Sequence, residues 1–351
     1  MRRLLIGALA ALVLTTAPAL GRAAANTLDI YFIDVEGGQS TLIVTPAGES
    51  LLIDTGFPSD GTFNSTPGAP ATARDAQRIL AAARAAGLTR IDYLLTTHYH
   101  ADHDGGAVEL AQLIPIGTFI DHAAPSAEAQ KAVAGTGALY DGYVKLRATG
   151  KHINPKPGDR LPLKGLEAIV VATNGQVVSK PLAGAGQPNA ACRGEGVAAQ
   201  EKTENPNSTA VRLQYGRFRF LDLGDLSGPP LFALTCPANL IGESDVYLIA
   251  HHGGNDASDP SLYAAVKPLV AVFNNGTTKG AQGDTLATVK KLGIDGWQLH
   301  RTSNVGAENN PDDRIANLDE TTSAWIKISA KDNGSFTVTN GRTGQSKSYS
   351  K

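Results

Sequence analysis

The segment from residue 96 to residue 106 concentrates side chains that can bind metal. It reads Thr-Thr-His-Tyr-His-Ala-Asp-His-Asp-Gly-Gly, with three histidines and two aspartates in seven consecutive positions. Residues two apart in an extended segment point the same way, so His98 and His100 can converge on one ion. Asp102 and His103 follow just beyond the bend and can reach a second ion. An ordinary hydrophobic core does not require this cluster, and its imidazoles and carboxylates suit Zn²⁺, with Mn²⁺ or Fe²⁺ as alternatives.

Two later segments place similar side chains directly after apolar runs. Asp225 follows the run 218–221, and the pair His251-His252 follows the run 246–249. Taken alone, Asp225 could be a turn carboxylate and the histidines a surface pair. Side chains at the ends of separate strands can meet at one sheet edge, however, and we expect them to add a carboxylate and a late imidazole to the metal centre. We favour His251 over His252 as the ligand, although both project from the same turn.

Other polar residues carry weaker interpretations. Asp54 follows the apolar run 51–53, and we expect it to support the histidine loop by hydrogen bonding, with turn capping as the alternative. His122 and His152 lie outside all of these segments, and we interpret them as surface or insertion histidines.

The elements that must position these residues are short apolar runs typical of strands. Between them, residues 73–86 show helical spacing, with Thr72 as the expected N-cap and Gly87 as the stop. Shorter helices are expected at 107–113 and 286–292, and 125–150 is interpreted as a helical insertion. The stretches 56–71 and 174–206 are rich in Gly and Pro and predict long loops, either rim loops of a site or surface insertions. The pattern is mixed α/β without strict alternation of strand and helix. Strands are expected at 28–35, 41–44, 51–53, 93–95, 168–171, 210–213, 218–221, 246–249, 269–273 and 324–328.

The first 25 residues have the layout of a secretory signal. Two arginines precede an apolar run from Leu4 to Val13, and small residues follow at 23–25. The run is shorter than the roughly 20 residues of a membrane span, so stable membrane insertion is not expected. General secretion and twin-arginine export both remain open. We therefore predict a periplasmic or secreted protein whose residues 26–351 form a single domain with insertions near 125–150 and 174–206.

Net charge and cysteine content indicate which partners and which covalent links to expect. Of 31 Lys and Arg, three lie in the signal segment, which leaves 28 against 33 acids, a balance of −5. This balance gives no support to a dedicated nucleic-acid surface. Cys192 and Cys236 are the two cysteines, and in an exported protein they predict one disulfide. A thiolate metal ligand is the alternative, but neither cysteine belongs to a C-x-x-C or Cys/His cluster.

The motif H-x-H-x-D-H resembles the signature of the metallo-β-lactamase superfamily, and further segments resemble its competence-protein-type branch. The resemblance implies an αββα sandwich, in which two mixed sheets are flanked by helices and the site lies at one edge. It also implies that Asp225 is a carboxylate bridging two ions, and that Asn207, Ser208 and His300 lie near the substrate or behind the ligands. The segments that carry the resemblance are 33–40, 51–56, Asn207-Ser208, 220–225, 249–254 and His300-Arg301-Thr302 with Gly306-Ala307.

The chain departs from these relatives at two positions. No histidine occurs between His152 and His251, where the hydrolytic β-lactamases take a third ligand for the first ion. Asn207-Ser208 stands there instead, so we expect an incomplete first shell, filled by water, Asn207 or the bridging acid. The branch also carries a histidine in a late turn where this chain has residues 275–280 without one.

Together these features predict an exported hydrolase with two divalent ions. Water activated between the ions would attack phosphorus or a carbonyl carbon, with Asp102, Asp225 and His252 as catalytic residues. His252, or else His300, would donate a proton to the leaving group. The resemblance favours a phosphodiester or phosphomonoester substrate, and it includes nuclease-like activity on nucleic acid among the expected reactions. Amide or lactone hydrolysis and a non-catalytic metal-binding domain are the alternatives, and the sequence leaves the oligomeric state open.

Overall fold

The computed structural model of the protein describes residues 26–192 and 201–351. The predicted signal segment, residues 1–25, lies outside the described residues, so that assignment stays a prediction. Within the described part of the chain, no helix is long and apolar enough to cross a membrane.

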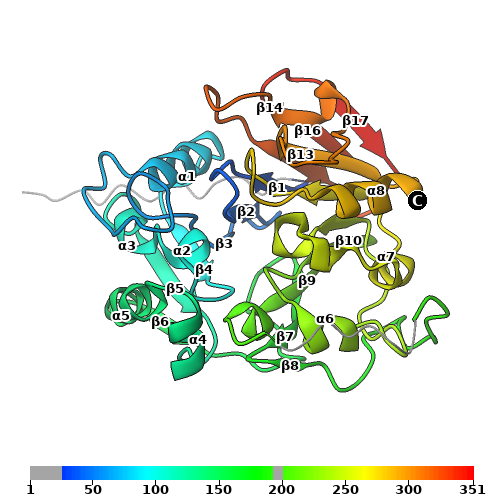
Figure 1. The fold of residues 1–351 in the computed structure, drawn as a ribbon, viewed down its shortest axis with the longest axis horizontal. Helices are drawn as coiled ribbons and strands as arrows, with labels where there is room; N and C mark the ends of the chain where they lie inside the picture. The colour runs from blue at the N-terminus through cyan, green and yellow to red at the C-terminus, as the bar shows by residue number, and fades with distance from the viewer. Residues whose placement is uncertain (1–25, 193–200) are drawn as a thin grey trace, which may run out of the picture.

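Two mixed β-sheets form the centre of the molecule (Figure 1). The first sheet runs in the order β17-β16-β15-β1-β2-β3-β4-β5-β6, and the second in the order β14-β13-β12-β11-β10-β9-β7-β8. Strands of the first sheet are β1 (Leu28–Phe32), β2 (Thr41–Val44), β3 (Ser50–Ile53), β4 (Ile91–Leu95), β5 (Ile116–Ile120), β6 (Lys151–Ile153), β15 (Ile326–Ala330), β16 (Phe336–Asn340) and β17 (Ser346–Tyr349). Strands of the second sheet are β7 (Glu167–Thr173), β8 (Gln176–Val177), β9 (Ala210–Tyr215), β10 (Phe218–Asp222), β11 (Val246–Leu248), β12 (Val270–Phe273), β13 (Asp295–His300) and β14 (Ile315–Asn317).

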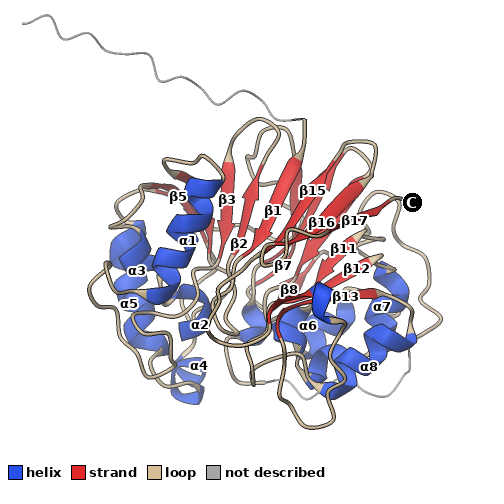
Figure 2. Ribbon diagram, turned by 90° about the horizontal axis from the view of Figure 1, so that it is seen from above, coloured by secondary structure: helices blue, strands red, loops and turns tan. Residues whose placement is uncertain are grey.

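Helices cover the outer face of each sheet (Figure 2). One apolar cluster joins inward-facing residues of both sheets, such as Phe32 and Phe220, whose rings meet edge to face at 5.8 Å. A second cluster packs the first sheet against its helices, and a third packs the second sheet against its own. The predicted αββα sandwich is therefore confirmed. The helices are α1 (Arg74–Ala85), α2 (Ala101–Asp104), α3 (Ala107–Leu110), α4 (Ala127–Ala132), α5 (Thr136–Arg147), α6 (Gly228–Ala233), α7 (Pro260–Val266) and α8 (Gly283–Lys291).

The local predictions hold for most elements and fail at some boundaries. Each apolar run predicted as a strand overlaps a strand of the structure, and 125–150 contains α4 and α5. Thr72 is not the N-cap of α1. Ala73 occupies that position, while the Thr72 hydroxyl donates to the Ala69 carbonyl at 3.2 Å. Polar strands such as β6 and β17 escaped prediction because they bury few side chains and therefore show no apolar alternation.

The predicted disulfide between Cys192 and Cys236 is present, with Cα atoms 5.7 Å apart. It ties the Gly/Ala-rich loop that follows β8 to the segment that follows α6. Of the two predicted long loops, 56–71 contains no helix or strand, and the described part of 174–206 contains only β8 and a 3₁₀ turn at Asn205–Asn207.

Candidate metal centre

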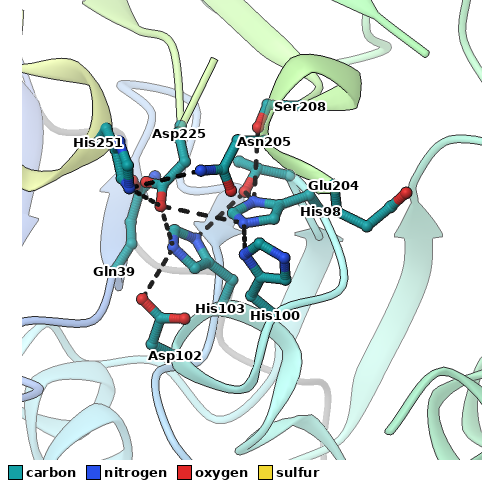
Figure 3. A network of polar contacts seen from close by, with 12 residues as sticks. Gln39, His98, His100, Asp102, His103, Glu204, Asn205, Ser208, Asp225 and His251 are labelled. Carbon is teal, nitrogen blue, oxygen red and sulfur yellow. Dashed lines mark hydrogen bonds and ion pairs between the residues drawn. The ribbon is translucent and has the colours of Figure 1, made fainter. Parts of the chain in front are cut away.

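The predicted metal-binding side chains come from three strand ends that meet at one edge of the sandwich (Figure 3). The histidine loop follows β4 in the first sheet, Asp225 follows β10 in the second, and His252 follows β11 beside it. The Asp225 turn can approach the histidine loop closely because it contains Gly224. A Cβ atom added at Gly224 would lie 2.9 Å from the Cβ atom of Thr97, and its φ of +54° favours glycine.

Four buried residues form the centre of the cluster: Asp102, His103, Asp225 and His252. Their candidate ligand atoms all lie within 4.8 Å of one another. The Nε2 atom of His103 is 3.3 Å from Asp102 Oδ2 and 3.2 Å from Asp225 Oδ2. The Nε2 atom of His252 is 3.2 Å from each of the same two oxygens. Two imidazoles and two carboxylates aimed at one point are a donor set that suits a divalent transition metal.

His98 and His100 lie beside this cluster, on the side of Asp225. The Nε2 atom of His98 lies 4.0 Å from Asp225 Oδ2 and 2.9 Å from His100 Nδ1. The Oδ2 atom of Asp225 is thus within reach of both pairs of histidines. On the other side of these groups, His100 Nε2 and Asp225 Oδ1 are buried without a hydrogen-bond partner among the described residues. Buried polar atoms of this kind are normally satisfied, and an imidazole nitrogen and a carboxylate oxygen in this position fit the coordination of a metal cation.

The charge states of His98, His100 and Asp225 suit metal binding, whereas Asp225, Asp102 and Asp54 outweigh burial and hold the pKa of His103 well above its ordinary value. Burial lowers the pKa of His98 well below its ordinary value, and it lowers the pKa of His100 to about 4, so both imidazoles are neutral near pH 7. Burial alone would raise the pKa of Asp225, but the neighbouring histidines, His103 first, outweigh it and hold that pKa well below the usual range. Neutral imidazoles and an ionised carboxylate are the forms that ligate metal.

Asp54 lies behind the histidine loop and contacts it directly. It is fully buried and accepts hydrogen bonds from the Thr97 backbone N–H at 2.7 Å and from the Thr97 hydroxyl at 2.6 Å. Its Oδ2 atom lies 2.7 Å from Nδ1 of His103. A carboxylate bound to Nδ1 fixes the tautomer and orientation of the ring, leaving Nε2 free to face the cluster.

The geometry reverses our preference between the two adjacent histidines. His252 is buried within the four-residue cluster, whereas the side chain of His251 is 31% exposed, with Nε2 3.8 Å from Asp225 Oδ2. Both residues have left-handed backbone angles, with φ of 50° and 55°, and this turn sends the two rings in different directions. Asp256 holds His251 Nδ1 at 2.8 Å. Burial lowers the pKa of His251, but Asp225 and Asp256 outweigh burial and raise it to about 9.

Of the two residues at the position of the absent third histidine, Ser208 lies near the site and Asn207 does not. The Ser208 hydroxyl lies 3.5 Å from His98 Nδ1, behind the ring. Asn207 turns away and donates from Nδ2 to Glu204 at 3.0 Å. Asn205, which sequence reasoning missed, faces the site instead. Its Nδ2 atom is 3.4 Å from His251 Nε2, and its Oδ1 atom is buried with no partner in the described ranges.

Two further histidine assignments need correction. His300 is not at the metal cluster, because its Nε2 atom binds Asp34 at 2.7 Å and lies 3.5 Å from Glu36 in a separate buried group. His122 is not a surface residue. It is 1% exposed, and its Nε2 atom lies 3.3 Å from Glu204. His152 is half-exposed on β6 and bonds to Asp121 at 2.8 Å.

Lys279 is the second residue that sequence reasoning missed. Its ammonium group contacts Asp102 and donates to the Gly37 carbonyl at 2.8 Å. Lys279 lies in the turn 275–280, where the competence-protein-type branch carries a histidine and this chain does not. This departure from the branch was the sequence signal that could have pointed to Lys279. Lys279 and His251 line a cavity of about 690 Å³ that opens beside the cluster and is walled by Phe63 and Gln282. Two cationic side chains thus border the approach to the site.

Comparison with known proteins finds one family model that matches part of the chain. Residues 33–181 match the model of the metallo-beta-lactamase superfamily. No curated protein matches the sequence. Solved structures with a similar arrangement include the diiron beta-hydroxylase CmlA from Streptomyces venezuelae, at 14% identity and a TM-score of 0.41 over 72% of this chain and 45% of that one. They also include YhfI from Bacillus subtilis, at 12% identity and 0.44 over 78% and 95%. A diphosphatase of the PhnP family matches at 13% identity and 0.41 over 87% and 98%.

The chain spans about half the length of the CmlA structures it resembles, and at these TM-scores the likenesses carry no argument about function. The family match, the two-sheet sandwich and the histidine–aspartate cluster do agree with one another. Residues 33–181 of this chain thus match the metallo-beta-lactamase superfamily model, and the chain carries a candidate metal-binding cluster.

Proposed function

We propose that the protein is an exported metal-dependent hydrolase that acts on phosphoesters. The observation that carries the proposal is the cluster of Asp102, His103, Asp225 and His252, with His98 and His100 adjoining it through Asp225. In this assignment His103, His252 and Asp102 would hold one divalent ion and His98 and His100 would hold a second, with Asp225 close enough to both groups to serve each of them. Zinc fits the donor set best, with manganese or iron as alternatives. The disulfide supports export, because such bonds persist in oxidising compartments.

The side chains around the cluster have separate tasks in this proposal. Divalent ions held there would lower the pKa of a water molecule and stabilise the negative charge that develops in the transition state. Asp54 keeps His103 oriented through Nδ1. His251, rather than His252, is the proton donor to the leaving group, because its side chain is 31% exposed at the cavity and held by Asp256 through Nδ1, whereas His252 is buried in the cluster.

The substrate class follows from the charges beside the cluster. Lys279 and His251 place two cations on the cavity wall, an arrangement that favours an ester with a negatively charged group over a neutral amide or lactone. We therefore assign a phosphodiester or phosphomonoester, the substrate class that the resemblance to the competence-protein-type branch also favours. A nucleic-acid substrate draws no support from the net charge.

The first test is a substrate panel with metal-stripped protein reloaded with Zn²⁺ or Mn²⁺. We expect hydrolysis of bis-p-nitrophenyl phosphate or p-nitrophenyl phosphate, and none of a chromogenic β-lactam or a lactone. Single-stranded DNA is included to test nuclease activity. Turnover of the lactam or lactone alone would replace the phosphoester assignment. Failure to retain any divalent ion would favour the non-catalytic alternative.

Three variants test the assigned roles. Asp225→Ala should abolish turnover and lower the metal content of the folded protein. His252→Ala should lose one equivalent of metal. His251→Ala should keep its metal and slow the cleavage of alkyl phosphates more than that of p-nitrophenyl phosphates, because p-nitrophenolate leaves without a proton. His152→Gln, half-exposed on β6, is the matched control. Loss of metal in His251→Ala but not in His252→Ala would exchange the two roles.

A further inference from the structure

A second cavity, of about 460 Å³, lies on the second sheet and is lined by residues entirely different from those of the metal cluster. Its floor is the β9–β10 hairpin, which contributes Arg212 and Arg219. Its roof is the Gly/Ala-rich loop 183–191. The remaining described wall residues are Asn239, Gly242, Glu243, Ala264, Ala265 and Lys267.

The hairpin register places both arginines on the outer face. Val211, Leu213, Phe218 and Phe220 belong to the core between the sheets, so the residues that alternate with them face the other way. Arg212 pairs with Leu221, two residues from Arg219 on the neighbouring strand. Diagonal positions of this kind bring long side chains on one face within reach of each other. The two guanidinium groups therefore share the cavity floor.

Neither guanidinium has an acidic partner among the described residues. Arg212 is 3% exposed and donates to Gln214 Oε1 at 3.1 Å, while the Nε atoms of both arginines are buried and unpartnered. The nearby acids are otherwise engaged. Glu243 pairs with Lys267 at 2.9 Å, and Asp245 accepts from the backbone N–H of residue 219 at 2.8 Å. Burial, reinforced by the like charge of Arg219, lowers the pKa of Arg212 to about 10.

The roof of the cavity is fastened to the body of the protein. Backbone hydrogen bonds join Leu182 to Leu240 at 2.8 Å and Gly186 to Asn239 at 2.7 Å. The Cys192–Cys236 disulfide closes the far end of the same loop. Because the loop is held at both ends and its residues are mostly small, the space above the arginines is a built feature of the fold. A cavity of this volume is large enough for a small-molecule ligand.

We propose that this cavity binds a small molecule through an oxyanion group, a phosphate or a carboxylate, held by Arg212 and Arg219. Buried donors without partners are costly, and a guanidinium fork matches two oxygens of a phosphate or carboxylate. An oxyanion in the cavity would lie against both arginines that line it and would offset the repulsion between the two charges. The site is independent of the proposed hydrolysis, since none of its residues contacts the metal cluster in the described structure.

Titration calorimetry of the purified protein with inorganic phosphate and with succinate tests the proposal and distinguishes the two chemistries. We expect saturable binding of at least one anion, weakened tenfold or more in Arg219→Met and in Arg212→Met. Arg217→Met, an exposed arginine in the turn of the same hairpin, should bind as the wild type does. Absence of saturable binding for both anions would overturn the proposal. Binding unchanged in Arg212→Met and Arg219→Met would overturn it too, because the anion would then occupy another site.

The melting temperature without ligand distinguishes a binding role from a structural one. Replacing a buried charge that has no acidic partner among the described residues with an apolar side chain of similar length should leave the Tm of Arg212→Met at or above the wild-type value. A clearly lower Tm for this variant would indicate that Arg212 has a partner within the protein and would count against the proposal. If Arg212→Met fails to fold, Arg219→Met, whose side chain is less buried, still decides whether the anion binds here.

Discussion

Glu204 and His122 form a buried pair whose protonation should make stability depend on pH. The Oε2 atom of Glu204 lies 3.3 Å from Nε2 of His122, and both side chains are almost completely buried. Nδ1 of His122 is 2.7 Å from the Ala123 carbonyl and therefore carries the hydrogen of the neutral ring. This leaves Nε2 as an acceptor. The two facing atoms make no hydrogen bond in this geometry, and the protonated Glu204 carboxyl is the form that could supply one. Burial raises the pKa of Glu204 from 4.5 to about 7 and lowers that of His122 to about 4.

The size of the effect follows from the shift of Glu204. A carboxyl whose pKa is higher in the folded state contributes stability below its unfolded pKa, and that stability is lost as pH rises through the folded value. The rise from 4.5 to about 7 corresponds to about 3 kcal/mol of free energy of unfolding, lost between about pH 4.5 and pH 8. Glu204→Gln keeps a donor for His122 and cannot ionise. Its free energy of unfolding should therefore rise relative to that of the wild type by about 3 kcal/mol between about pH 4.5 and pH 8.

This gain can be measured by urea unfolding of the wild type and Glu204→Gln at pH 5, 6, 7 and 8. Both proteins are stripped of metal first, because metal binding itself depends on pH. The difference in free energy of unfolding should move steadily in favour of the variant as pH rises. Glu128→Gln, an exposed glutamate on α4, should show no such trend. A difference that stays constant from pH 5 to pH 8 would refute the neutral-pair interpretation.

Three further substitutions test the site and the core. Asp54→Asn should weaken metal affinity about 10- to 100-fold, measured by competition with a chelator, because the His103 ring loses its anionic partner. Gly224→Val should lower both activity and Tm, since its Cβ would press on Thr97 at a backbone angle that disfavours a β-branched residue. Phe220→Ala should cost about 3–5 kcal/mol in urea unfolding, because this fully buried ring packs between the sheets, and Phe220→Leu should cost less.

The chemistry of the metal centre could be predicted from the sequence because it is locally encoded. His98, His100, Asp102 and His103 occupy one short segment, and Asp225 and His252 each follow an apolar strand. The spacing of residues within a strand and the turn that ends it determine which side chains emerge together. Residue types and strand ends thus predicted a metal site and its class of ligand without any long-range information, and the resemblance to the metallo-β-lactamase superfamily predicted the αββα fold.

Only the tertiary structure decided which neighbours complete the site. The choice between His251 and His252 depends on the left-handed backbone of one turn, which adjacent residues in a sequence cannot reveal. The contact of Lys279 with Asp102, the pairing of His300 with Asp34, and that of Glu204 with His122 each join distant segments. Such contacts are determined by how the two sheets and their loops pack, because packing, and not the local pattern, sets the distances between side chains from different elements.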